Sequence, residues 1–271
     1  IQPDQIAGGS YRLYKPNGGR VVKLHTLRVG DFFLADGHLL PYDTDKEKVQ
    51  ASNVVGIVFQ TNPARVGDAE KKVLGGEAHA LVMALKNAAV DVTFWITRPV
   101  ESYLPACRSK AEGYNDISGY WNSEQMRKAC GDFSNYPALK AADEYNKYYP
   151  VPATTTGWFL PSSGQWWDIL QNLGSSHDLA QSDQQNSSAT EDPDAAGFVW
   201  NGNVAAALNG WLSEVAAEGK STFDESMMWF WSSSEYSDGY AIRWNVTIYD
   251  WLKSGHTSKM FRGYVRPILA F

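Results

Sequence analysis

The sequence predicts an α+β protein whose sheet is mainly antiparallel, with two or three helices and long loops. Short apolar runs rich in Val, Ile and Phe occupy the first hundred residues, helical periodicity follows between residues 137 and 219, and strand-like alternation returns after residue 231. This order of strands, helices and strands is typical of α+β folds rather than of alternating βαβ units. The chain has 271 residues, of which 44% are hydrophobic, so it can bury one sizeable core.

The first strands are predicted from apolar runs bounded by turn residues: Asp31–Ala35, Val54–Phe59, Ala80–Leu85 and Val92–Ile96. Residues 1–27 before them are rich in Gly and polar side chains, so we expect an N-terminal arm or the end of a preceding segment. Within this arm, residues 19–24 could pair as an edge strand. The domain itself is predicted to span residues 28–271.

Two helices are predicted from start and stop signals. The first begins at Pro137 and ends before Pro150, because proline fits the first helical turn and not the interior. The second follows a capping box at Ser162–Gln165 and ends at Gly174. Its apolar stripe must pack against the sheet. From this helix and the strands beside it we predict a core that contains Trp158, Leu160, Trp166, Ile169, Leu170 and Trp231.

A third helix is predicted between Val204 and Val215, where apolar residues recur at helical spacing before Gly219. The segment Ser175–Gly197 separates the second and third helices. It is rich in Ser, Asp, Gln and Asn, which indicates a long solvated loop.

The last forty residues return to strand character. Residues 242–249 alternate at period two, so one set should face the core: Ile242, Trp244, Val246 and Ile248. The other set should face solvent: Arg243, Asn245, Thr247 and Tyr249. The stretch Tyr264–Phe271 predicts one buried terminal strand. Arg266 within it needs an acceptor, and Glu235 is the expected partner.

Composition and motifs exclude several functions. The 24 basic and 30 acidic side chains give a net charge of −6, which argues against a nucleic-acid partner. No apolar run is long enough to insert in a membrane. The five His are scattered, Glu218–Thr222 lacks the first glycine of a phosphate-binding loop, and no nucleophile motif occurs, so we expect no metal, cofactor or catalytic site. Cys107 and Cys130 could form one disulfide or remain free thiols.

Four stretches of the chain carry a family resemblance. They are GDFFLADG at 30–37, VVGIVF at 54–59, GWFLPSSGQWWDIL at 157–170, and WSSSEY at 231–236 with YVRPILAF at 264–271. Together they resemble a C-type-lectin-fold family of gut bacteria and their phages, which includes fimbrial tip proteins and the variable proteins of diversity-generating retroelements. The resemblance covers roughly residues 28–271 and implies a C-type-lectin-like domain.

The sequence lacks the site residues of two related groups of proteins, so the resemblance does not extend to their functions. The formylglycine-generating enzymes need a reactive cysteine pair late in the domain, and here no Cys follows Cys130. Calcium-dependent lectins carry EPN or QPD together with WND near the sugar. This chain has QPD only at residues 2–4, outside the domain, so calcium-dependent sugar binding is not implied.

In retroelement-diversified proteins, randomised adenines in AAC or AAT codons never produce Glu, Gln, Lys, Met or Trp. Between Tyr236 and Phe271 there is no Glu or Gln, and the positions expected to be exposed all hold permitted residues. An ordinary polar sheet edge with loops explains the pattern equally well. From this pattern, with loops expected at 254–258 and 261–263, we predict one ligand-binding patch made of Ser237, Asp238, Tyr240, Arg243, Asn245, Thr247, Tyr249, Asp250, Ser254, His256, Thr257, Ser258, Phe261 and Arg262.

The prediction is therefore a non-enzymatic receptor or adhesion protein, outside the cell on a cell surface or a virion tail tip. Its partner is expected to be a protein or glycan on another cell surface, with multivalent display on a pilus or virion. Exposed Tyr and Phe would supply apolar contacts, and Arg and Asp would direct polar ones. Two alternatives stay open: an enzyme related to the formylglycine-generating type, and a structural pilus subunit.

Overall fold

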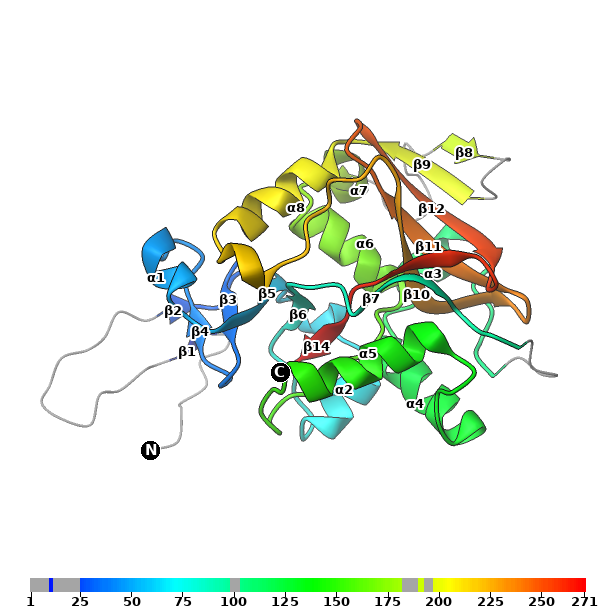
Figure 1. Cartoon of the computed structure of the whole chain (residues 1–271), viewed down its shortest axis with the longest axis horizontal. Coiled ribbons are helices and arrows are strands. Elements are labelled where there is room, and N and C mark those ends of the chain that lie inside the picture. Colours follow the sequence, from blue (N-terminus) through cyan, green and yellow to red (C-terminus); the bar gives the residue numbers. More distant parts are fainter. Residues whose placement is uncertain (1–9, 12–24, 98–102, 182–189, 193–196) are drawn as a thin grey trace, which may run out of the picture.

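The computed structural model describes residues 10–11, 25–97, 103–181, 190–192 and 197–271. These residues form three sheets and eight α-helices, which confirms the predicted α+β class with mainly antiparallel pairing. The number of helices is larger than predicted, because most of the additional ones are too short to show an apolar period. A seven-stranded sheet, a five-stranded sheet and the helices around them occupy most of the molecule (Figure 1).

The five-stranded sheet is antiparallel throughout and has the order β14 (Ile268–Ala270), β6 (Leu81–Ala84), β5 (Val54–Gln60), β3 (Phe32–Leu34) and β4 (Leu39–Leu40). Three of the apolar runs in the sequence correspond to β3, β5 and β6, as predicted. The single strand predicted over 264–271 is wrong. Pro267 separates β13 from β14, and the two strands belong to different sheets.

The seven-stranded sheet has the order β7 (Ala89–Thr93), β13 (Arg262–Val265), β10 (Met228–Ser237), β11 (Tyr240–Val246), β12 (Trp251–Ser258), β9 (Gly197–Asn201) and β8 (Thr190–Asp192). Only the pair β10–β13 is parallel. The strand predicted over 92–96 is β7, which begins three residues earlier and ends at Thr93. Residues 254–258, predicted as a loop, belong to β12.

The three predicted helices are present as α5 (Pro137–Tyr148), α6 (Ser163–Asn172) and α8 (Val204–Ser213). Ser162 and Gln165 form the predicted capping box of α6. The sequence analysis did not predict five further helices: α1 (Lys46–Gln50), α2 (Asp68–Val73), α3 (Lys110–Asn115), α4 (Gly119–Cys130) and α7 (His177–Gln181). The predicted loop 175–197 contains α7 and β8, and the rest of it lies partly outside the described residues.

Helix α6 lies between the two large sheets and organises the core. Its indole, Ile and Leu side chains join apolar residues from both sheets and from α8 in one cluster. Strand β7 and helices α4 and α5 contribute to a second cluster, which covers the other face of the seven-stranded sheet near β13 and part of β10. The core prediction is confirmed, because every member is buried: Trp158, Leu160, Trp166, Ile169, Leu170 and Trp231.

Residues 1–27 are described only in part. Strand β1 (Ser10–Tyr11) pairs with β2 (His25–Thr26) in an antiparallel manner. The edge strand considered for residues 19–24 lies outside the described residues. The division into an arm (1–27) and a domain (28–271) stays a prediction.

Candidate functional site

Strand β11 confirms part of the alternation predicted for residues 242–249. Three apolar side chains are buried as predicted: Ile242, Trp244 and Val246. Three predictions are wrong: Asn245 and Thr247 are fully buried, and Ile248 is 43% exposed. The main cause is that β11 ends at Val246, after which the chain turns and period-two alternation no longer applies.

Thr247 and Asn245 are buried for different reasons. The Thr247 hydroxyl accepts a hydrogen bond from the Tyr249 amide (3.1 Å) and donates to the Trp251 carbonyl (2.9 Å), so it closes the β11–β12 turn. Asn245 lies on β11 between Trp229 of β10 and Lys253 of β12, its two cross-strand neighbours.

The predicted binding residues do not form one patch, because they lie on both faces of the sheet and in three of its turns. The β10–β11 turn and its flanks hold Ser237, Asp238 and Tyr240. The face of the sheet toward α6 has Ser254, His256 and Ser258, and the opposite face has Arg243, Asn245 and Thr257. The β11–β12 turn holds Thr247, Tyr249 and Asp250. The end of β12 leads to Phe261 and Arg262.

Arg266 is fully buried, as a structural role requires, but its predicted partner is wrong. The guanidinium donates to three backbone carbonyls, those of Ala84 (3.1 Å), Leu85 (2.6 Å) and Ser221 (2.7 Å). Burial lowers the pKa of Arg266 to about 9. Glu235 instead forms a buried ion pair with Lys259, a residue 24 positions further along the chain.

A cavity of about 310 Å³ opens between helix α3 and the α6-facing side of β9, β11 and β12. Its floor consists of three buried indoles: Trp167, Trp200 and Trp244. The rings of Trp200 and Trp244 stack with centroids 5.4 Å apart, and Trp167 stands edge-on to both at 5.1 and 5.9 Å. This volume is at the small end of ligand pockets.

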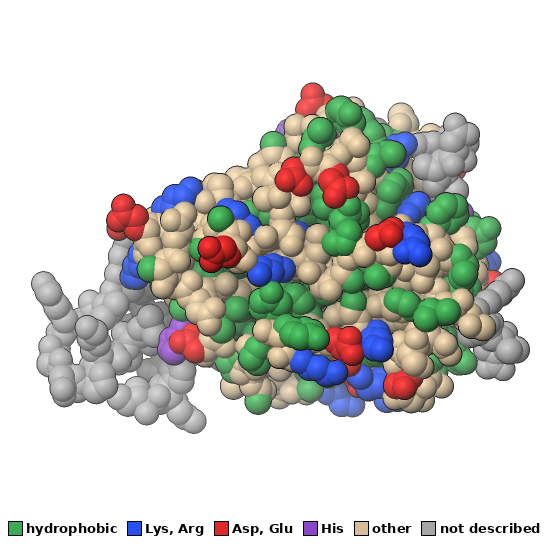
Figure 2. Space-filling view, in the orientation of Figure 1, with side chains coloured by type: hydrophobic (Ala, Val, Ile, Leu, Met, Phe, Trp, Pro, Cys, Tyr) green, Lys and Arg blue, Asp and Glu red, His purple; other side chains and the backbone are tan. Residues whose placement is uncertain are grey.

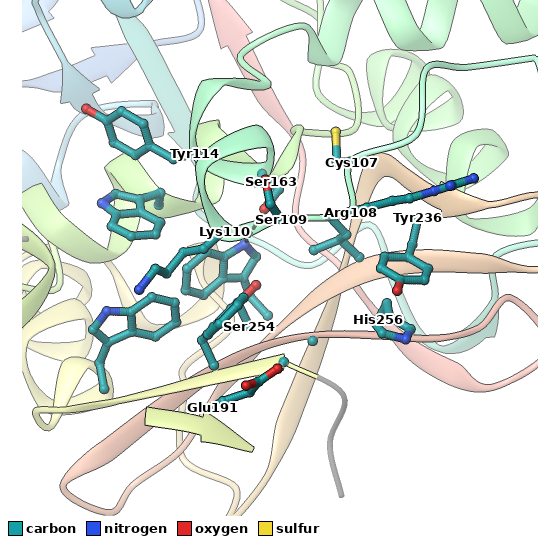
Figure 3. Close-up of a pocket in the computed structure, with 18 residues that line it drawn as sticks. Cys107, Arg108, Ser109, Lys110, Tyr114, Ser163, Glu191, Tyr236, Ser254 and His256 are labelled. Carbon is teal, nitrogen blue, oxygen red and sulfur yellow. Dashed lines mark hydrogen bonds between the residues drawn. The ribbon is translucent and has the colours of Figure 1, made fainter. Parts of the chain in front are cut away.

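Polar and aromatic side chains surround that floor. Tyr236 and His256 stack at one end, with ring centroids 3.5 Å apart, and Tyr114 of α3 lies at the other end (Figure 3). The polar lining includes Arg108, Ser109, Lys110, Glu191 and Ser254. We refer to this cavity, with its indole floor and polar lining, as the aromatic pocket.

Two of the three indoles in the floor of the aromatic pocket carry an N–H group without a hydrogen-bond partner. The indole N–H groups of Trp167 and Trp200 are buried and unpaired, whereas the Trp244 N–H donates to the Ser163 hydroxyl at 3.2 Å. Leaving a buried donor unpaired costs about 1–3 kcal/mol. Such unpaired groups are uncommon in native protein interiors.

Helix α3 forms one wall and is fixed by two devices. Ser109 and Glu112 form a capping box at its start. At its end, Arg65 donates to the Tyr114 carbonyl (3.1 Å), lies 4.0 Å from the Tyr114 ring centroid and pairs with Asp168 of α6 (3.0 Å). The Ser-x-x-Glu spacing was the signal that could have predicted α3 and this wall from sequence.

The chemistry of the pocket suits binding better than catalysis. Cys107 lines it, but burial, followed by the nearby Asp116 charge, raises the pKa of this thiol to about 12. The thiol therefore stays protonated at neutral pH and is a poor nucleophile. Cys107 and Cys130 are both free thiols. Within the described residues, no group of three His, Cys, Asp or Glu side chains is placed to hold a metal ion.

Comparisons with known proteins give fimbrial relatives. No protein-family model matches the chain. The chain is 23% identical over 194 residues to Fim1C of Bacteroides ovatus, described as a fimbrium tip subunit; the match covers 60% of this chain and 36% of that protein. The fold is similar to the crystal structure of a fimbrial protein from Bacteroides ovatus, with a TM-score of 0.59 and 21% identity over 91% of this chain.

The chain spans about half the length of that crystallised fimbrial protein and about a third of Fim1C. At these identities, the structural likeness establishes a shared α+β fold. Among the helices that the structure describes, none combines the length and the apolar composition needed to cross a lipid bilayer.

Proposed function

We propose that this chain is a non-enzymatic, extracellular ligand-binding subunit of a bacterial surface fimbria, and that the aromatic pocket binds a saccharide. The observation that carries the proposal is the pocket itself, which has an indole floor with hydroxyl and cationic side chains at its edge. Aromatic faces pack against the C–H faces of a sugar ring, and the polar groups direct its hydroxyls. The fimbrial descriptions of both relatives support a place at the cell surface of a bacterium rather than on a virion.

The proposal includes two earlier predictions: that the domain has a C-type-lectin-like fold, and that residues 237–263 are diversified by a retroelement. The mixed architecture and antiparallel sheets support assignment to the C-type-lectin-like class. Diversification of residues 237–263 would be restricted, because Asn245 and Thr247 are buried and a Cβ added to Gly263 would lie 2.8 Å from the Trp229 carbonyl. A near-identical copy of the 3′ coding end beside a reverse-transcriptase gene, differing mainly at adenines, would test diversification.

Filling the aromatic pocket tests the saccharide proposal. Ser254 on β12 lies between Trp244 and Phe198, its cross-strand neighbours, so Ser254→Phe would occupy the cavity without interrupting the strand. On an array of defined oligosaccharides, we expect the wild type to bind a subset and Ser254→Phe to lose it.

The matched control is Val90→Phe, which adds the same side chain at an exposed position of β7, at the other end of the same sheet. This variant should keep the binding pattern of the wild type. Unchanged binding by a folded Ser254→Phe variant would refute the pocket as the saccharide site.

A structural pilus subunit is the second candidate, supported by the fimbrium-subunit description of the Bacteroides ovatus relative. The two functions differ in what the pocket variant should do. If the chain has only a structural role in the fimbria, cells that express the Ser254→Phe variant should assemble fimbriae and adhere to glycan-coated surfaces as wild-type cells do. If the chain also binds, assembly should persist while adhesion falls.

A further inference from the structure

Arg243 lies on the face of the seven-stranded sheet opposite the aromatic pocket, because its neighbours Ile242 and Trp244 line that pocket. Its guanidinium carbon is 4.1 Å from the centroid of Trp229, 5.7 Å from Phe261 and 5.9 Å from Trp231. The guanidinium is thus surrounded by three aromatic rings and is half-buried.

The hydrogen-bonding capacity of Arg243 is largely unused. Its guanidinium donates a weak hydrogen bond of 3.5 Å to the Arg262 carbonyl, and its buried Nε–H has no partner. None of the ion pairs among the described residues involves Arg243, and burial lowers its pKa to about 10. Other covered arginines are better satisfied, since Arg65 pairs with Asp168 and Arg266 donates to three carbonyls.

The residues beside Arg243 leave an approach to the guanidinium. Its partner on β12 is Gly255, which has no side chain to cover it. The next pair along the strands is Asn245 with Lys253, and neither side-chain polar atom of Asn245 has a hydrogen-bond partner although both are buried. Three of the nine unpaired buried polar atoms found among the described residues therefore belong to Arg243 and Asn245.

We propose that Arg243, with Lys253 beside it, binds the carboxylate of an acidic saccharide on this outer face of the sheet. A guanidinium matches a carboxylate through two parallel N–H···O bonds, and aromatic rings around it restrict its orientation. A carboxylate would compensate the positive charge of Arg243, which forms no ion pair with any other described residue. This site is separate from the aromatic pocket, so an experiment can refute one of the two binding proposals and leave the other standing.

An acidic saccharide is favoured over an acidic peptide by the aromatic surface next to Arg243. Phe261 is 59% exposed at one side, and Tyr249, 51% exposed, stacks on Trp251 near Lys253. These rings offer flat apolar surfaces of the size of a sugar ring on both sides of a cation pair. The strand backbone beneath is already paired to β10 and β12, so no sheet edge is available here for a peptide strand.

The test compares D-glucuronate with D-glucose, which share a ring and differ by the carboxylate, in NMR titrations of the full chain that follow arginine Nε–H signals. The wild type should bind glucuronate, and Arg243→Met should bind it at least about ten-fold more weakly, as expected for loss of a charged hydrogen-bond pair. Arg243→Lys should fall between the two, because it keeps the charge and loses the planar fork. Lys253→Met should weaken binding less and raise no folding problem, since Lys253 is partly exposed.

The matched control is Arg28→Met. Arg28 also lies over an aromatic ring, that of Tyr42 at 5.7 Å, but it precedes β3 and is remote from this sheet in the fold. This variant should bind glucuronate as the wild type does. Equal affinity for glucose and glucuronate, or full binding by both Arg243→Met and Lys253→Met, would overturn the proposal. Tighter binding of a short Asp- and Glu-rich peptide than of glucuronate would overturn the saccharide class.

Discussion

The two large sheets differ in what covers their faces. In the five-stranded sheet, every residue of β5 and β6 is buried, and neighbouring side chains belong to different apolar clusters on the two faces. In the seven-stranded sheet, one face packs on α6 and α8, whereas the other face is covered by α4 and α5 only near β13 and β10. Over β11 and β12 this second face carries half-buried cations and unpaired polar atoms instead of a layer of apolar side chains.

The difference separates a scaffold from a surface that accepts partners. A sheet buried on both faces contributes stability and leaves nothing for a ligand to contact. A sheet with one open face can present ordered side chains at fixed spacing, and here those side chains are aromatic or cationic. Charges of both signs are interspersed over the side of the molecule seen in Figure 2, so binding there would depend on local groups rather than on a broad charged field.

Substitutions in β5 are expected to change stability most, because this strand is buried on both faces of its sheet. Ile57 and Val58 are adjacent, fully buried and in opposite clusters. Ile57→Ala should lower the free energy of unfolding by about 2–5 kcal/mol and Val58→Ala by about 1–3 kcal/mol, measured by urea denaturation. Thr257→Ala on the open face of β12 should change it by less than about 0.5 kcal/mol. A neutral Val58→Ala would mean that the five-stranded sheet also has an open face.

The same contrast explains what the sequence could predict. Continuous apolar runs predicted β3, β5 and β6, and the capping box with its apolar stripe predicted α6, because local signals and burial agree there. The open face of β11 was predicted poorly. Asn245 is buried by neighbours from β10 and β12, and Thr247 by the turn, and neither contact is visible in the period-two pattern.

The aromatic pocket was missed for a related reason. Its floor combines Trp167 from α6, Trp200 from β9 and Trp244 from β11, which are far apart in the chain. Only tertiary pairing brings them together. The chain contains 11 Trp, but the sequence alone cannot distinguish indoles that line a cavity from indoles that fill a core.

The buried part of the molecule also contains a group whose effect on stability depends on pH. Glu70 of α2 is fully buried against α6, where its Oε1 accepts a hydrogen bond from Gln165 (3.0 Å) and its Oε2 has no partner. Burial raises its pKa to about 7. The folded state therefore binds a proton that the unfolded state releases near pH 4.5, so this group's contribution to stability is complete below that pH and is lost as the pH rises through 7.

Replacing Glu70 by Gln removes this titration while keeping the shape of the neutral acid. The free energies of unfolding of Glu70→Gln and the wild type should agree within error at pH 4 and diverge above it, with the variant more stable at pH 8 by up to about 3 kcal/mol. Parallel stability curves for the two proteins between pH 4 and pH 8 would show that Glu70 does not titrate in that range.

The smallest effect on stability is expected where the open face is most exposed. The Tyr249 ring stacks on Trp251, the Phe261 ring lies at the edge of the Arg243 site, and both rings are more than half exposed. The double replacement by Ala should therefore leave the Tm within about 2–4 °C of the wild type. Binding of glucuronate should nevertheless fall, because the flat surfaces on both sides of the cations are removed. Calorimetry measures the Tm and the NMR titration measures the affinity for glucuronate, so the two effects are determined independently. A double variant that unfolds would place these rings in the scaffold, and one that keeps its affinity would leave Arg243 and Lys253 as the whole site.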